Sequence, residues 1–275
     1  MKITIAHSPD SDDAFMHYAV TRGKIDCGSY EFDHVLADIE TLNRAAVEGK
    51  YEVTAISIHA YAHLHDRYHL LNHGASMGEG YGPVVVAREP GNRESLAGKK
   101  ILVPGEWTSA ALALRMWYPD AITEIAPFDQ IIDRVLGNAA DAGVIIHEGQ
   151  LTYAEEGLHA ITDLGVWWAE ETGGLPLPLG GNAIRRDLGP EVMRDVSRIL
   201  RESIAYALEN REEALDFAED YGRGLTREQA DRFVDMYVNQ RTLDYGDDGR
   251  EAVRLFLERG GEIGVIPNFE PEFVA

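Results

Sequence analysis

The chain has 275 residues, of which 45% are hydrophobic, and a formal net charge of −22. This length exceeds the usual size of one hydrophobic core, so we expect two lobes or one large α/β unit. Nucleic-acid-binding surfaces are built on clustered lysine and arginine, and the charge therefore excludes them. The only cysteine, Cys27, leaves no partner for an intramolecular disulfide and no cysteine-based zinc site.

No stretch reaches the roughly 18 apolar residues that a membrane-spanning helix needs. The first residues become polar at Ser8, too early for a secretory signal, so we expect a cytoplasmic protein. Only five lysines accompany the many acidic residues. This composition is typical of proteins from a salt-rich cytoplasm, although it fits an ordinary acidic enzyme equally well.

Strand and helix patterns alternate along the chain, which predicts an α/β fold. In the first part, Asp38 can cap a helix that Gly49 ends. The apolar run at residues 53–58 indicates a buried strand. Strands are expected at residues 2–6, 30–36, 53–58, 68–71 and 84–87, and helices at 13–22 and 39–48.

A second set of alternating elements follows, and after it the chain is mostly helical from about residue 182 to 259. Strands are expected at residues 101–103, 123–126, 142–146 and 160–163, and helices at 108–117, 129–136 and around 167.

Two breaks in this alternation predict where the chain passes between lobes. Polar residues fill 88–100, and glycine and proline dominate 173–181. We therefore expect residues 1–90 and 180–275 to form one discontinuous lobe and residues 91–179 to form the other. Each lobe would be a sheet flanked by helices, with a ligand cleft between the lobes at the carboxyl ends of the strands.

Polar residues stand at several predicted strand ends. Ser8, Asp10 and Asp12 follow the first strand, and we interpret them as a wall of the cleft, although capping alone explains one or two of them. Ser57 ends the buried strand, as a helix cap, a cleft residue or both. Thr108 and Ser109 open a helix after another strand, where N–H groups and hydroxyls can seat a carboxylate or phosphate.

His147 ends the apolar strand at residues 142–146. Imidazole is well matched to proton transfer near neutral pH, so His147 is the candidate base, although a lone histidine is usually structural. His59 and His63 have the spacing of two metal ligands, but no third ligand or His-Glu-x-x-His pattern accompanies them, and we expect no metal. Neither a serine nucleophile elbow nor a dinucleotide-binding glycine pattern is present.

Several of these stretches together resemble the 1,4-dihydroxy-6-naphthoate synthase family of the futalosine route to menaquinone. Each piece alone is weak, but the ordered set is specific and runs over nearly the whole chain. The matching stretches are DIETLNR at 38–44, SIHAYA at 57–62, GYGPVVVAR at 80–88, VPG at 103–105, IIHE at 145–148, GLPLPLG at 174–180, SIAYAL at 203–208 and TLD at 242–244.

The resemblance implies a type II periplasmic-binding-protein fold and a cofactor-free carbon-carbon lyase. The substrate would be cyclic dehypoxanthine futalosine, and the products 1,4-dihydroxy-6-naphthoate and a three-carbon sugar fragment. It assigns the proton acceptor to His147 and substrate contacts to Ala55, Ile56, Ser57, Thr108 and Ser109.

This chain departs from the family pattern at two places. Some members carry a lysine where Ala55 stands, so a carboxylate would here be seated by Thr108, Ser109 and their N–H groups. The loop with Asp10, Ser11 and Asp12 replaces a version with cysteine, proline and asparagine. Two alternatives stay open: the related chorismate dehydratase of the same pathway, and a cytoplasmic protein that binds an organic acid without reacting it. The partner is a small molecule in each case, and the sequence does not fix the oligomeric state.

Overall fold

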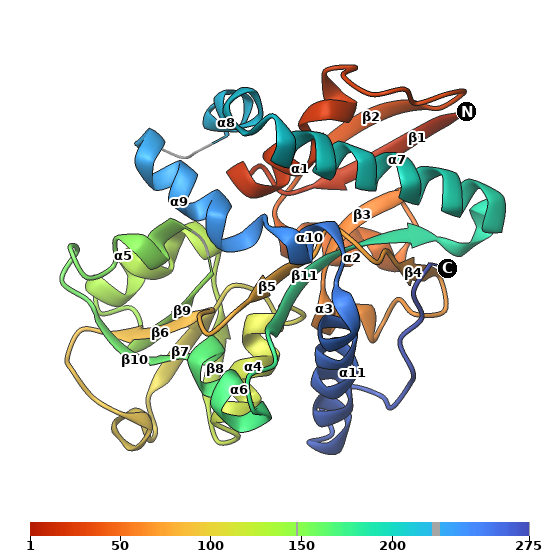
Figure 1. Ribbon diagram of the computed structural model, residues 1–275. Coiled ribbons are helices and arrows are strands. Elements are labelled where there is room, and N and C mark those ends of the chain that lie inside the picture. The colour runs from red at the N-terminus through yellow and green to blue at the C-terminus, as the bar shows by residue number, and fades with distance from the viewer. Residues whose placement is uncertain (147, 222–225, 275) are drawn as a thin grey trace.

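A computed structural model describes residues 1–146, 148–221 and 226–274 of the chain. Helices flank two separate β-sheets (Figure 1), which confirms the predicted α/β class. No helix in the described ranges is long and apolar enough to cross a membrane.

The first sheet places the N-terminal strands side by side in parallel. Strand β1 (Lys2–His7) lies between β2 (Glu31–Leu36) and β3 (Val53–Ser57), so the carboxyl ends of all three meet at one edge. Every residue of β3 is buried, as its apolar run predicted. The late strand β11 (Leu177–Arg185) is antiparallel to β3 and also pairs with β4 (Tyr68–Leu70) and β5 (Ser76–Gly78).

The second sheet has the strand order β10-β6-β9-β7-β8 within the described residues. Strand β7 is parallel to both of its neighbours, whereas β6 is antiparallel to β9 and β10. Their bounds are β6 (Val84–Ala87), β7 (Lys100–Val103), β8 (Ile122–Ile125), β9 (Ala142–Ile145) and β10 (His159–Asp163).

The chain passes from the first sheet to the second between Gly78 and Val84, and it returns before Leu177. The first passage is earlier than the crossing expected within residues 88–100, because β6 pairs on both edges with strands of the second sheet. The polar stretch after β6 is a connection between β6 and β7, two strands of the second sheet, and it contains a short 3-10 helix, η1 (Arg93–Leu96). The division into lobes 1–90 with 180–275 and 91–179 stays a prediction.

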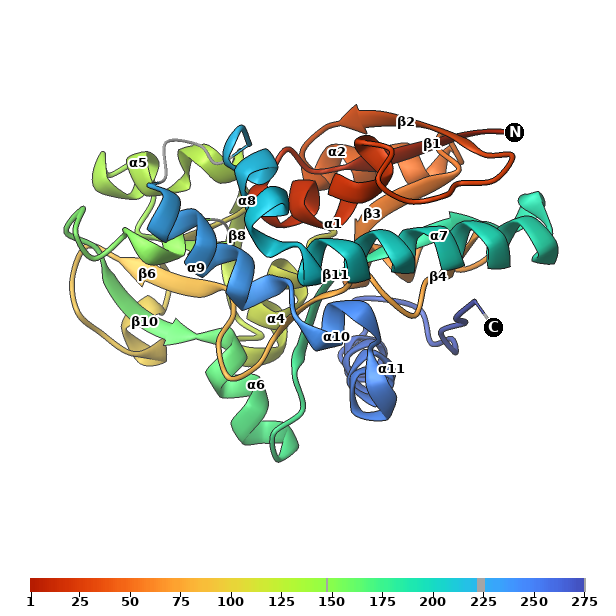
Figure 2. The ribbon, with the colours of Figure 1, turned by 45° about the horizontal axis from the view of Figure 1, so that its top comes forward.

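Helices cover both sheets, and the helices that follow β11 return to the first one. Helix α1 packs against α7, α8 and α9, and Figures 1 and 2 both show α9 between α8 and the strands of the second sheet. The bounds are α1 (Ser11–Thr21), α2 (Ile39–Val47), α3 (Ile58–Tyr61), α4 (Ser109–Trp117), α5 (Ile131–Leu136), α6 (Leu164–Thr172), α7 (Pro190–Glu209), α8 (Arg211–Glu219), α9 (Arg227–Tyr237), α10 (Gln240–Leu243) and α11 (Gly246–Glu262), with 3-10 turns η2 (Phe128–Gln130), η3 (Glu148–Leu151) and η4 (Arg186–Leu188).

Candidate active site

One pocket collects the carboxyl-end loops of strands from both sheets. It brings together all eight described residues that the sequence predicts as substrate contacts: Ser8, Asp10, Asp12, Ala55, Ile56, Ser57, Thr108 and Ser109. The predicted base, His147, lies outside the described residues. The residues around it in sequence, Ile146 and Gln150, also line the pocket.

The loop after β1 forms an acidic wall that Ser8 organises. The N–H of Ser8 donates to Oδ2 of Asp13 at 2.8 Å, and its hydroxyl donates to Oδ2 of Asp10 at 2.7 Å. Asp12 lies beside them and accepts a hydrogen bond from the hydroxyl of Ser76 at 3.5 Å. The loop therefore holds three carboxylates in fixed positions at the first turn of α1.

Asp13 is the most perturbed of these carboxylates. Burial raises the pKa of Asp13 to about 6, and the nearby charge of Asp10 acts in the same direction. The hydrogen bonds from Ser8 favour the charged form and oppose this shift. A carboxyl group with such a pKa exchanges protons close to neutral pH, which is a property of acid–base groups.

Ser57 is held by Asn43, a fully buried residue of α2. The N–H of Ser57 donates to Oδ1 of Asn43 at 2.9 Å, and Nδ2 of Asn43 donates to Oγ of Ser57 at 3.2 Å. Because the hydroxyl oxygen of Ser57 accepts from Asn43, its own hydrogen is directed elsewhere. Ser57 can therefore donate to a ligand from a fixed position in the pocket.

Thr108 and Ser109 open α4, but their hydroxyls already have partners in the protein. Oγ1 of Thr108 caps the helix by accepting from the N–H of Ala111 at 3.2 Å. The hydroxyl of Ser109 donates to the carbonyl of Leu179 at 2.5 Å and accepts from the N–H of His59 at 3.2 Å. Within the described chain, the N–H groups of Ser109 and Ala110 have no acceptor. The backbone N–H groups, and not the hydroxyls, are therefore the donors that this helix end can offer to an anion.

The charged side chains among the described pocket residues are all acidic. Asp10, Asp12, Asp13 and Asp38 are among the lining residues, and the described part of the lining contains no lysine or arginine. Ala55 packs against Ala6, Leu42 and Tyr51 in a small apolar cluster. A carboxylate in this pocket would depend on N–H and hydroxyl donors.

Several of the described histidines pack against other groups of the protein, and within the described ranges no group of side chains could hold a metal. His59 donates through Nδ1 to the carbonyl of Thr108 at 3.1 Å, and His63 stacks on Trp107 with ring centroids 4.5 Å apart. A separate cluster lies behind the acidic loop, where the His17 ring centroid is 4.7 Å from that of His7 and 5.8 Å from that of His34.

Comparison with known proteins shows the family. The profile of a family described as menaquinone biosynthesis matches residues 3–262. The chain is also 40% identical to the 1,4-dihydroxy-6-naphthoate synthase of Thermus thermophilus over 273 residues, which is 99% of each protein. The chain belongs to this menaquinone-biosynthesis family.

Solved structures share the fold of this chain. A protein from Archaeoglobus fulgidus superposes with a TM-score of 0.92 and 52% identity, over 96% of this chain and 98% of the other. The ligand-binding component of an ABC-type import system from Staphylococcus aureus superposes with a TM-score of 0.73 over 99% and 96%, at 10% identity. The latter likeness concerns the fold alone, which is that of periplasmic binding proteins, as predicted.

The sequence patterns did not indicate three residues that line the pocket, or a fourth that supports it from behind. Asn182 of β11, Gln150 and Tyr237 line the pocket, and the last two are hydrogen-bonded to each other. Asn43 holds the pocket residue Ser57 from a helix. Asn43 had one signal, because it is a polar residue on the buried face of an amphipathic helix. The other three depend on contacts between distant segments, which residue patterns do not reveal.

Proposed function

We propose that this chain is a carbon-carbon lyase that converts cyclic dehypoxanthine futalosine to 1,4-dihydroxy-6-naphthoate. The observation that carries the proposal is the pocket of this family member, which unites every described residue to which the sequence assigned a substrate contact. The curated relative of Thermus thermophilus bears the name of this activity. We further propose that the enzyme works in the cytoplasm on this small molecule and without a metal or other cofactor.

We propose His147 as the general base. It follows β9, whose four residues are all buried, so the backbone that leads to it is rigid. Ile146 before it and Gln150 after it line the pocket. In the proposed reaction the base takes a proton next to a ketone, elimination opens the sugar ring, and a C–C bond then breaks. Aromatisation drives the sequence forward, and one positioned base contributes about 10²–10⁴-fold.

The donors at the end of β3 and the start of α4 suit the carboxylate of the substrate. The N–H groups of Ser109 and Ala110 and the hydroxyl of Ser57 are donors in the same pocket. Positive helix-terminal dipoles stabilise a negative group or a developing enolate. Donors of this kind replace the lysine that some relatives carry at the position of Ala55.

The test is incubation of the purified protein with cyclic dehypoxanthine futalosine and, separately, with chorismate, followed by mass spectrometry. Formation of 1,4-dihydroxy-6-naphthoate supports the proposal. Dehydration of chorismate would reassign the enzyme within the pathway, and binding of either acid without any product would indicate a binding protein.

His147→Asn tests the base within the same assay. Asparagine keeps approximate shape but accepts no proton at neutral pH, so the variant should fold and bind substrate while turnover falls by about 10²-fold or more. Near-normal turnover would contradict the assignment. Lost binding with an intact fold would make His147 a substrate contact and direct the search for the base to Asp10, Asp12 and Tyr153.

A further inference from the structure

Tyr237 and Gln150 are 87 residues apart in sequence and meet at the pocket. The hydroxyl of Tyr237 donates to Oε1 of Gln150 at 2.8 Å. Nε2 of Gln150 donates in turn to the carbonyl of Ile145 at 3.3 Å. Both polar ends of the amide are occupied, so its orientation is fixed.

These contacts join residues that stand before and after His147 in the sequence. Ile145 is the last residue of β9, two positions before His147, and Gln150 follows three positions after it in η3. The side-chain amide of Gln150 therefore links η3 to the end of β9. Tyr237 links this amide to the end of α9.

Tyr237 is itself held rigidly. Its side chain is 4% exposed, and it makes edge-to-face contacts with Phe233 and Tyr81 at centroid distances of 5.0 and 5.8 Å. The hydroxyl of Tyr81 donates to the carbonyl of Met236. Burial raises the pKa of Tyr237, and the charge of Asp12 adds to this effect, so the phenol keeps the proton that it donates.

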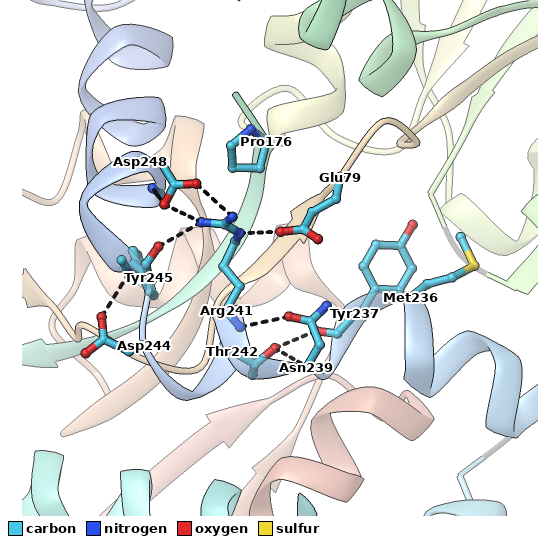
Figure 3. Close-up of polar contacts among 12 residues, drawn as sticks. Glu79, Pro176, Met236, Tyr237, Asn239, Arg241, Thr242, Asp244, Tyr245 and Asp248 are labelled. Atoms are coloured by element: carbon cyan, nitrogen blue, oxygen red, sulfur yellow. Dashed lines mark hydrogen bonds and ion pairs between the residues drawn. The ribbon is translucent and has the colours of Figure 1, made fainter. Parts of the chain in front are cut away.

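The helix that follows Tyr237 is anchored to the passage between the sheets. Figure 3 shows Arg241 of α10 reaching Glu79 on one side and Asp248 of α11 on the other. The pair with Asp248 is bidentate, at 2.8 and 2.9 Å, and Nη1 also donates to the carbonyl of Tyr245 at 2.9 Å. Glu79 and Tyr81 both lie in the passage that leads to β6. This passage therefore supports the end of α9 through two contacts, one between Glu79 and Arg241 and one between Tyr81 and Met236.

We propose that the Tyr237–Gln150 hydrogen bond fixes the end of β9 relative to η3, the two described segments that flank the proposed base in the sequence, and that turnover depends on this hydrogen bond. The inference rests on the proposed function and gives Tyr237 and Gln150 the role of positioning residues. Such a contact acts on the alignment of the base, and small misplacement of a reacting group reduces turnover by up to about 10²-fold.

The kinetic test compares Tyr237→Phe with Tyr30→Phe. Tyr30 also donates its hydroxyl to a side chain, that of Asp195 at 3.0 Å, but it lies outside the pocket, so its variant is a matched control. We expect Tyr237→Phe to lower kcat by about tenfold and to leave KM within about twofold. Gln150→Leu should have the same effect, and the double variant should lose no more than either single variant. A higher KM at unchanged kcat would make Tyr237 a substrate contact and overturn the proposal.

Hydrogen–deuterium exchange of the free enzyme gives a readout that needs no substrate. Peptides that cover residues 142–151 should exchange faster in Tyr237→Phe and in Gln150→Leu than in wild type or Tyr30→Phe. Unchanged exchange in these peptides would overturn the proposal, even if kcat falls. If the wild type does not act on cyclic dehypoxanthine futalosine, the proposed function fails, whereas the exchange result still decides whether this contact holds the segment.

Discussion

Asn43 and Ser57 are joined by two hydrogen bonds, one from the Ser57 N–H to Oδ1 of Asn43 and one from Nδ2 of Asn43 to the Ser57 hydroxyl oxygen. Asn43 is fully buried and is not among the residues that line the pocket, so its amide acts on the pocket by holding Ser57. The pair explains how a serine at a strand end acquires a fixed donor direction.

Asn43→Ala should therefore affect both stability and binding. The N–H of Ser57 would be left buried and unpaired, which costs about 1–3 kcal/mol. We expect urea unfolding at a lower midpoint and a KM several-fold higher. Asn210→Ala is the control, because its amide donates only to the carbonyl of Tyr206, away from the pocket. An unchanged KM in Asn43→Ala would show that the orientation of Ser57 does not matter for the substrate.

Asp13→Asn should stabilise the protein at alkaline pH. The folded-state pKa of Asp13 is raised to about 6 from an ordinary value near 3.8. Its favourable contribution is thus present at low pH and is lost as the pH rises through about 6, which costs up to about 3 kcal/mol at pH 8. Asparagine keeps the acceptor for Ser8 and carries no charge. Urea unfolding should show a gain for the variant at pH 8 that shrinks at pH 4.5, and an equal gain at both values would contradict the shift.

The histidine cluster should make the fold sensitive to acid. Burial is the largest cause that lowers the pKa of His7 and His34 to about 4, and it lowers the pKa of His17 well below its ordinary value. The unfolded chain takes up protons near pH 6.5, so stability is present above that pH and is lost as the pH falls toward 4. His7 alone accounts for about 3 kcal/mol of this loss, and the carboxyl of Asp13 offsets part of it.

The variant His17→Leu distinguishes the acid sensitivity that this cluster causes from acid effects elsewhere in the protein. Neither ring nitrogen of His17 has a hydrogen-bond partner within the described chain, and the residue is 2% exposed. Leucine removes two unpaired buried polar atoms, so the variant should be more stable at pH 7 and should lose less stability between pH 6.5 and 4. A slope equal to that of the wild type would place the acid sensitivity elsewhere.

Thr108→Ala should lower stability as well as affinity, because the hydroxyl caps α4. Loss of such a cap costs about 1 kcal/mol. It also loosens the first turn, whose N–H groups face the pocket. Thr108→Ser keeps the capping oxygen and should retain both properties. Thermal unfolding and substrate titration of the two variants measure these effects.

The sequence located eight residues of the pocket because they lie in or soon after apolar runs. Ser8, Ser57 and Thr108 stand at the ends of strands or just beyond them, and the parallel strands within each sheet bring their carboxyl ends to one edge. The apolar run of β6 carried no information about which sheet it joins, because its partners β9 and β10 come later in the chain. The meeting of Tyr237 and Gln150 depends on the return of the C-terminal helices, and no local pattern indicates it.

The absence of lysine and arginine from the described pocket lining has a consequence for the kinetics of encounter. A substrate with a carboxylate approaches a protein of net charge −22 toward a mouth that bears four aspartates. Its association is therefore slowed by repulsion over a distance set by the ionic strength, about 10 Å at 0.1 M salt and about 3 Å at 1 M. The capture rate, measured as kcat/KM, should rise as salt is added, in contrast to enzymes that attract anionic substrates with a basic cleft.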